Sequence, residues 1–328
     1  MLKSIDHIVI LVNDLTAAIR DYDALGFTVV PGGEHSGGRS RNALVAFEDG
    51  TYLELVAFRD NEVPPDHHFF RSHGQEGLIN YALLPTDIQA DIDAARERGL
   101  GLNGPIPGGR VRPDGQQIQW QTAQATSHDL PFLCGDITPR ELRVPDGFVL
   151  AHQNGATGVS ALGIVVNDIE TSRERYSALL GPDTVLDDIQ EIEDRREVAF
   201  HVGGTLVVLA QPTGPGEARD YLESRGEGPY LLILSAKPNI RSDFNDMSRT
   251  HGVHLSLASD PLVVNSVGEE YAYIAGLSCS RCGGSYRVVR QSLSASPGKV
   301  PMDIIEVVCQ KCGQSGMLHF DISRFFGR

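Results

Sequence analysis

The sequence has no long apolar run and comparatively little positive charge. No apolar stretch in the 328 residues approaches the roughly 18 residues that a membrane-spanning helix requires, which excludes such a helix. Lys and Arg number 28 against 43 Asp and Glu, for a formal net charge of −15. A chain this acidic lacks the basic surface of a non-specific nucleic-acid binder, so we expect neither a membrane nor a nucleic acid as partner.

Cysteines are also few, and their arrangement argues against a disulfide framework. There are five, an odd number, and four of them form two Cys-x-x-Cys pairs. That spacing favours metal binding in a reducing, cytoplasmic environment. The apolar segment at residues 8–12 meets Asn13 and Asp14 without a small-residue cleavage site, so we expect a strand there and not a signal peptide.

The chain does contain an internal repeat. Residues 11–15 (Leu-Val-Asn-Asp-Leu) recur as residues 165–169 (Val-Val-Asn-Asp-Ile), an offset of 154 that also maps Tyr22 onto Tyr176. Weaker echoes add two more units, so that four related units start near residues 4, 77, 159 and 229. A repeat of this length indicates a fold built from duplicated supersecondary units.

Each unit opens with a short apolar strand, a turn and a helix. In the first unit Asp14 can cap a helix over residues 15–25, and Gly26 can end it. We expect further strands at 27–30, 41–47, 51–58, 78–84, 117–123, 131–134, 160–166, 184–187, 197–202, 205–210 and 229–235, and further helices at 88–98, 170–180 and 239–249. The order β-α-β-β-β predicts an α+β fold.

Short motifs spread over this part of the chain point to a known family. They are residues 5–9 (Ile-Asp-His-Ile-Val), 13–15, 25–27, 31–33, 42–44, 52–55, 112–115, 130–132, 138–140 and 154–155. With them the sequence resembles the vicinal oxygen chelate superfamily of glyoxalases, bleomycin-resistance proteins and extradiol dioxygenases, and its glyoxalase-like branch most closely. The resemblance covers residues 4–240 and implies repeated βαβββ units that form open mixed-sheet cups.

The resemblance also implies a metal site. In this superfamily the metal ligands lie on the first and last strands of each unit, and His7 and Glu54 occupy those positions in the first unit. Both are therefore expected to be catalytic and to bind a divalent ion, whether Zn, Mn, Ni or Fe. A hydrogen-bonded core histidine is the alternative for His7, and pairing with Arg110 or Arg112 is the alternative for Glu54.

The other half of the ligand pattern is missing. The offset of 154 places Ala161 and Val208 at the positions of His7 and Glu54, and Asn80 stands at the first position of the second unit. Two ligands rarely hold an ion tightly. The candidates for a third ligand are His35, Asp136 and His152.

The remaining polar residues of the cup suit a small anionic or oxygen-rich molecule, because a guanidinium grips a carboxylate or phosphate in a two-pronged way. Surface ion pairing is the alternative for the arginines, and core packing is the alternative for Trp120. The expected substrate-binding residues are His35, Asn42, Arg110, Arg112, Trp120, Asp136 and Arg140.

A separate motif lies near the C-terminus. Cys279 and Cys282 form one pair, Cys309 and Cys312 form the other, and a glycine follows each pair. Four thiolates suit a closed, tetrahedral, structural zinc site. With strands at 286–291 and 303–308 the segment resembles a zinc ribbon; a redox pair and a rubredoxin-like iron site are the alternatives. The fifth cysteine, Cys134, is expected in the core.

These features predict three domains: a first glyoxalase-like domain (1–150), a shorter second one (151–258) and a zinc-ribbon-like domain (259–328). The leading hypothesis is a metal-dependent enzyme of the lyase, isomerase or dioxygenase type. The alternative is a metal-free protein that sequesters a small molecule, with the ribbon as an interaction module. A regulatory protein whose ribbon contacts nucleic acid fits the net acidity least, and a homodimer is left open.

Overall fold

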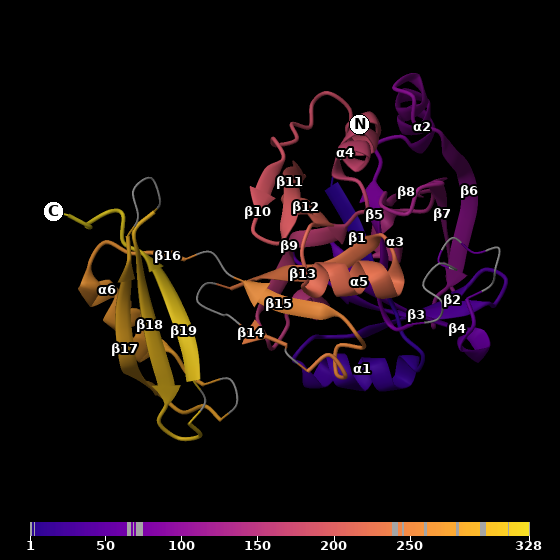
Figure 1. Ribbon diagram of the computed structural model, residues 1–328. Helices are drawn as coiled ribbons and strands as arrows, with labels where there is room; N and C mark the ends of the chain where they lie inside the picture. The colour runs from indigo at the N-terminus through magenta and orange to yellow at the C-terminus, as the bar shows by residue number, and fades with distance from the viewer. Residues whose placement is uncertain are drawn as a thin grey trace.

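The strands of the chain form three sheets. The computed structural model describes residues 2, 4–63, 67, 69, 75–237, 242–244, 246–258, 261–279, 282–295, 300–313 and 315–327. They build a closed barrel, an open seven-stranded sheet and a four-stranded sheet. Figure 1 shows the barrel and the open sheet together in one body, with the four-stranded sheet to one side. The α+β prediction is confirmed, and all described helices are too short or too polar to span a bilayer.

The barrel contains the first two units. Its strands are arranged in the order β1-β4-β3-β2-β6-β7-β8-β5. The elements are β1 (Ser4–Leu11), α1 (Leu15–Ala24), β2 (Val30–His35), β3 (Ser40–Ala46), β4 (Tyr52–Phe58), η1 (Arg59–Asn61), β5 (Gly77–Leu84), α2 (Ile88–Glu97), β6 (Leu102–Val111), β7 (Gln117–Ala125), β8 (Phe132–Asp136), α3 (Arg140–Arg143) and η3 (Gly147–Leu150).

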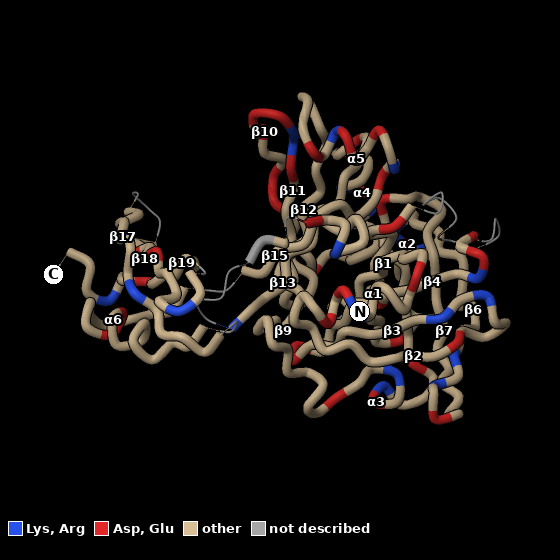
Figure 2. The backbone as a smooth tube through the Cα atoms, turned by 90° about the horizontal axis from the view of Figure 1, so that it is seen from below, with Lys and Arg blue, Asp and Glu red and all other residues tan. Residues whose placement is uncertain are grey.

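The seven-stranded sheet contains the third and fourth units. Its order is β10-β11-β12-β9-β13-β15-β14. The elements are β9 (Ala156–Val165), α4 (Ile169–Leu180), β10 (Gln190–Ile192), β11 (Arg195–Val202), β12 (Thr205–Pro212), α5 (Glu217–Arg225), β13 (Gly228–Ala236), β14 (Ser242–Asp243) and β15 (His254–Ala258). Figure 2 shows acidic residues gathered along β10 at the edge of this sheet.

The predicted repeat is present in the strand register. β1 pairs in parallel with β4, and His7 lies opposite Tyr52. β9 pairs in parallel with β12, and Ala161 lies opposite Leu206, which is the same pair moved by 154 residues. Aspartates cap the helices of the first three units alike: Asp14, Asp87 and Asp168 each accept hydrogen bonds from backbone N–H groups of the first turn.

The barrel and the second sheet share one hydrophobic core. A single cluster of buried side chains runs from Ile5 in β1 to Leu257 in β15. The hydroxyls of Tyr81 and Tyr176 lie 2.5 Å apart across the boundary, and Tyr176 donates to the carbonyl of Asp129. The two sheets therefore pack as one body.

The C-terminal sheet has its own core. It comprises β16 (Leu262–Val263), β17 (Tyr286–Ser294), β18 (Met302–Cys309) and β19 (Ser315–Asp321), with α6 (Val267–Gly276) beside it. Its buried residues, which include Ile305, Leu318 and Phe320, form a separate cluster. The predicted hairpin of residues 286–291 and 303–308 is present as β17 and β18.

Four local expectations were wrong. The strand expected at 27–30 is displaced, because residues 27–29 are not in a strand and β2 begins at Val30. Strand β6 was not expected, because its sequence, Leu-Asn-Gly-Pro-Ile-Pro-Gly-Gly-Arg-Val, has the composition of a loop. No strand covers residues 184–187, all of which the structure describes; the edge strand is β10 instead. Within 239–249, residues 242–243 form β14 and residues 247–250 a turn, so the described part of that segment is not helical, and residues 239–241 and 245 lie outside the described residues.

Candidate functional site

The barrel encloses a cavity of about 410 Å³. Strands β1 to β4 contribute His7, His35, Asn42 and Glu54 to its wall, and β6 contributes Arg110. Apolar and aromatic residues also line it; they include Val56, Phe58, Phe69, Ile106, Trp120 and Phe132. Further polar residues, among them Arg39, Asn103, Thr122 and Gln124, line the rest, so the cavity combines a compact polar cluster with a wall of mixed character.

Asp6 and His7 form the inner side of the polar cluster. Neighbouring residues of a regular strand point to opposite faces, but β1 has a register shift between Ile5 and His7, which is how a bulge redirects a side chain. His7 Nδ1 lies 2.6 Å from Asp6 Oδ2. An ionised carboxylate can only accept, so Nδ1 carries the proton and Nε2 faces the cavity. Tyr52 stacks on the His7 ring, with the ring centroids 4.7 Å apart.

Asp6 is held ionised by arginines. It is completely buried, and Arg143 donates to both of its oxygens, from Nη1 at 2.8 Å and from Nη2 at 3.1 Å. Arg140 also donates to Asp6. Burial alone would raise the pKa of Asp6, but the charge of Arg143 and the His7 ring hold it well below its usual range. The carboxylate of Asp6 is therefore ionised and accepts a hydrogen bond from the His7 ring.

Glu54 lies between two imidazoles. Its Oε2 is 3.5 Å from His7 Nε2, and its Oε1 is 3.3 Å from His35 Nε2. Asn42 Nδ2 donates to Oε1 at 2.7 Å. Burial acts to raise the pKa of Glu54, but the hydrogen bond and charge of His35, with His7 and Asn42, lower it far below its usual value. The carboxylate is therefore an anion, available to a metal or a proton.

The geometry brings one of the three candidate third ligands to Glu54, namely His35. His152 is occupied elsewhere, because its Nδ1 accepts from the Thr28 N–H and its Nε2 bonds the Ala46 carbonyl, both at 3.0 Å. Asp136 accepts hydrogen bonds from Arg140 and Arg143. Two imidazole nitrogens and one carboxylate are a donor set that suits divalent iron and related ions.

A second group of potential ligands, Asp6, His7 and Cys134, is less suitable. The oxygens of Asp6 already accept from guanidinium groups. Burial raises the pKa of the Cys134 thiol to about 12, which disfavours the thiolate when no metal ion is bound. Cys134 is buried, as expected.

Of the predicted substrate-binding residues, four line the cavity and three do not. His35, Asn42, Arg110 and Trp120 line it. Arg112 lies beyond the end of β6, where it pairs with Asp114 at 3.0 Å, and Asp136 and Arg140 belong to the ionic network around Asp6. The partners of Glu54 are the two histidines and Asn42, and neither Arg110 nor Arg112 is paired with it among the described contacts.

Sequence reasoning missed Asp6, Tyr52 and Arg143. The available signal was the charged pair Asp6-His7 inside an otherwise apolar strand, because a buried carboxylate needs a partner. Arg143 is only 2% exposed and satisfies that need, and its Nη1 also donates to the Tyr52 hydroxyl at 2.6 Å.

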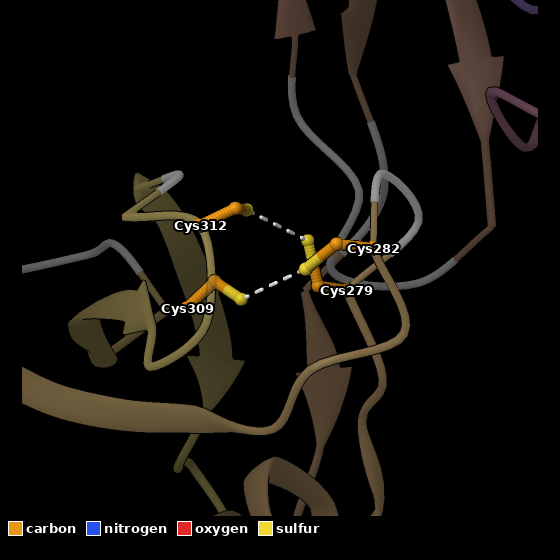
Figure 3. Close-up of side chains that lie close together, drawn as sticks. All are labelled: Cys279, Cys282, Cys309 and Cys312. Atoms are coloured by element: carbon orange, nitrogen blue, oxygen red, sulfur yellow. Dashed lines mark hydrogen bonds between the residues drawn. The ribbon is translucent and has the colours of Figure 1, made fainter.

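The C-terminal cysteines converge as predicted. Figure 3 shows the four side chains pointing toward one another, with Cys279 and Cys282 facing Cys312 and Cys309. The Sγ–Sγ distances are 3.6 Å for Cys279–Cys312 and 3.5 Å for Cys282–Cys309. Tetrahedral coordination with metal–sulfur bonds of about 2.3 Å separates sulfurs by about 3.8 Å, so the cluster can hold a metal ion.

Both cysteine turns have the same geometry. The Gly283 N–H donates to the Cys279 carbonyl at 2.8 Å, and the Gly313 N–H donates to the Cys309 carbonyl at 3.0 Å. The two glycines have φ values of +67° and +75°, which other residues rarely adopt. Backbone N–H groups of Cys312 and Lys311 lower the pKa of Cys309, which favours the thiolate.

Known structures and families place this architecture. The fold resembles that of a hypothetical protein from Staphylococcus aureus (12% identity, 79% of this chain and 100% of that one, TM-score 0.61). It also resembles a variant of 4-hydroxymandelate synthase from Streptomyces coelicolor (14% identity, 98% and 92% of the chains, TM-score 0.51). No curated protein matches the sequence. The glyoxalase-like domain family matches residues 5–180, more than half of the chain, so the chain belongs to the glyoxalase-like domain family.

Proposed function

We propose that the chain is a metal-dependent enzyme that binds a divalent ion in the barrel through His7, His35 and Glu54 and acts on a small oxygen-rich substrate. The observation that carries this proposal is the Glu54 carboxylate, which lies 3.5 Å and 3.3 Å from two imidazole nitrogens inside the cavity. A divalent ion with three protein ligands would supply Lewis acidity and open positions for substrate oxygens, and iron would add redox capacity. That donor set favours the dioxygenase type.

The other residues of the site have supporting roles in this proposal. Asp6 keeps the proton on His7 Nδ1, so that Nε2 offers its lone pair to the cavity. The Ser40 hydroxyl lies 2.8 Å from His35 Nδ1 and orients that ring, and Asn42 orients the carboxylate of Glu54. The apolar part of the wall keeps bulk water away from the reacting atoms.

A second candidate function is supported by the same contacts. Asn42 donates to Glu54, and both imidazole Nε2 atoms lie within ion-pair distance of it, so a proton on these nitrogens would balance the carboxylate without a metal ion. A metal-free protein that binds and sequesters a small molecule in the barrel is the alternative. The two functions differ in metal content.

We also propose that the four C-terminal cysteines hold a structural zinc ion and that residues 259–328 form a zinc-ribbon-like domain. Four sulfur ligands leave no open position for a substrate. The full chain would then contain two metal ions with distinct ligands.

Elemental analysis of the purified full chain tests these proposals. We expect two metal ions per chain in the wild type, of which His7→Ala and Glu54→Gln each remove one, while His201→Ala, a change at an exposed histidine of β11, removes none. A wild type that contains only the cysteine-bound ion after incubation with Fe²⁺, Mn²⁺, Ni²⁺ or Zn²⁺ would overturn the enzyme proposal in favour of the metal-free alternative.

A further inference from the structure

Two buried guanidinium groups in the barrel cavity differ sharply in their partners. Arg143 is 2% exposed and is saturated: it donates to Asp6, to Asp136 and to the Tyr52 hydroxyl. Arg110 is 4% exposed and donates one hydrogen bond, from Nη2 to the Arg143 carbonyl at 2.6 Å. Its Nε has no partner. Among the described residues Arg110 forms no ion pair with any carboxylate.

Burying a cation without an anionic partner costs free energy of folding. A guanidinium has five N–H donors, and its burial is offset only when those donors are satisfied by an anion or by other acceptors. Burial lowers the pKa of Arg110, and the nearby Tyr52 and Glu54 offset this only in part, although the group remains charged. The nearest functional acid, Glu54, is already occupied by Asn42 and the two histidines.

The wall of the cavity contains aromatic side chains close to the polar cluster. Trp120 lies opposite Gly108 in the β6–β7 pairing, and a side chain at Gly108 would overlap its indole ring. Phe132 stands edge-on to the His7 ring, with centroids 5.4 Å apart, and Trp120 stands edge-on to the His35 ring at 5.9 Å. The aromatic side chains of Phe132 and Trp120 therefore lie directly beside the two histidines of the polar cluster.

We propose that the cavity binds a monocarboxylate with an aromatic or similarly flat apolar body, and that Arg110 is the residue that binds the carboxylate. The free Nε of Arg110 completes a two-pronged contact with the carboxylate oxygens, and the apolar body packs against Trp120 and Phe132. A single negative charge matches Arg110, which is buried and has no carboxylate partner among the described residues, whereas a dianion would also face Glu54. The volume of about 410 Å³ sets the upper size of the ligand. The inference rests on the proposed function in that both place the ligand in the barrel.

The test compares an acid with its neutral isostere. Benzoate and benzamide are titrated calorimetrically into the full-length, metal-incubated protein, with acetate and inorganic phosphate as further probes. We expect the wild type to bind benzoate at least tenfold more tightly than benzamide or acetate. Arg110→Gln should remove the preference for the acid, Arg110→Lys should retain part of it, and Arg96→Gln, at an exposed arginine of α2, should leave it intact.

The outcomes separate this inference from the proposed function. Equal binding of benzoate and benzamide to the wild type, or tighter binding of phosphate, overturns the carboxylate assignment even if Arg110→Gln fails to fold. An acid preference that survives in a folded Arg110→Gln variant overturns the role of Arg110. If Glu54→Gln loses no metal but the Arg110-dependent preference for the acid is present, the metal proposal fails and the carboxylate site stands. If Glu54→Gln loses metal but the wild type shows no preference for the acid, the metal proposal stands and the carboxylate site fails.

Discussion

Asp6 and His7 link the buried guanidinium of Arg143 to the cavity of the barrel, because Asp6 contacts Arg143 and His7 lines the cavity. A one-residue irregularity in β1 lets two consecutive side chains meet, so that an arginine-bound carboxylate controls the tautomer of the histidine that faces the cavity. The strand pattern alone would assign the two side chains to opposite faces. For this reason His7 was predicted from the sequence as a cavity residue, whereas the contact between Asp6 and the His7 ring was not.

Replacing Asp6 by Asn should strongly destabilise the barrel. The change leaves Arg143 buried with one carboxylate fewer, and breaking a buried ion pair from one side costs about 3–5 kcal/mol. Urea unfolding at pH 7 measures the loss, and Asp93→Asn, at an exposed pair with Arg96, should change stability by less than about 0.5 kcal/mol.

The same variant should have a characteristic pH dependence. The pKa of Asp6 is depressed in the folded state, so its contribution is fully present above the unfolded value of about 3.9 and is lost as pH falls toward the folded value. The stability difference between wild type and Asp6→Asn should therefore be constant from about pH 5 to 7 and should shrink below about pH 4. A difference that grows at low pH would contradict this assignment.

Glu270 of α6 should make the C-terminal sheet less stable at alkaline pH. It is fully buried, neither carboxylate oxygen has a hydrogen-bond partner, and Oδ1 of the nearby Asp303 is also unpartnered. Burial, with Asp303, raises the pKa of Glu270 from 4.5 to about 7. The stability of the protonated form is present below pH 4.5 and is lost as pH rises through 7.

Scanning calorimetry of Glu270→Gln at about pH 5 and about pH 8 measures this effect. The variant should raise the unfolding temperature of the C-terminal sheet at the alkaline pH and leave it nearly unchanged at the acidic one. Glu306→Gln, a change at a half-buried position of β18, is the control and should show no such difference. Equal effects of Glu270→Gln at both pH values would contradict the raised pKa.

At the scale of elements, the glycines of β6 explain why this strand was hard to predict. Gly108 and Gly109 bring the strand close to β7: a Cβ at Gly108 would meet Trp120, and one at Gly109 would lie 2.7 Å from the Ile118 carbonyl oxygen. Glycine is normally a sign of a turn. Here the same residues are required for close approach of two strands, and that requirement is visible only in the pairing.

Gly108→Ala should move Trp120, and its effect is directly measurable because Trp120 is the only tryptophan. We expect a changed emission maximum and at least a severalfold weaker binding of benzoate, since the indole ring forms the wall of the cavity. Gly101→Ala is the matched control, because a Cβ there meets nothing within 4 Å. An unchanged emission spectrum in a folded Gly108→Ala variant would place the indole elsewhere.

The repeated elements were the most predictable part of the fold. Hydrophobic alternation, aspartate caps and the constant offset predicted the opening strand and helix of the first three units, because these signals are local. The convergence of His35 with Glu54 was not predictable, since it depends on how β2 and β4 are placed around a closed barrel. His35 was only one of three candidates at the level of sequence.

At the scale of the whole molecule, the separate cores predict two unfolding transitions. The barrel and the seven-stranded sheet share one cluster of buried residues, whereas the C-terminal sheet has its own. A strong zinc chelator, or Cys312→Ser, should lower or abolish the transition of the C-terminal sheet alone, because a structural metal supplies much of the stability of a small domain.

Calorimetry and tryptophan fluorescence report the two parts separately. Trp120 lies in the barrel, so its thermal transition should not move when Cys312 is replaced. Cys134→Ser, at a cysteine of the barrel, is the opposite control and should affect the fluorescence transition without altering zinc content. A single transition that shifts as a whole in Cys312→Ser would show that the two parts unfold cooperatively.

The matched registers of β1–β4 and β9–β12 give this protein an unusual property. Val9 lies opposite Glu54, and Gly163 lies opposite Val208, so the backbone that carries the acidic residue is duplicated with an aliphatic one in its place. The third unit thus repeats the strand register of the first unit without its histidine and glutamate. Replacing Ala161 by His and Val208 by Glu would test whether this strand pairing is sufficient to create a second ion-binding site. The site at His7 and Glu54 in the same chain would serve as the reference.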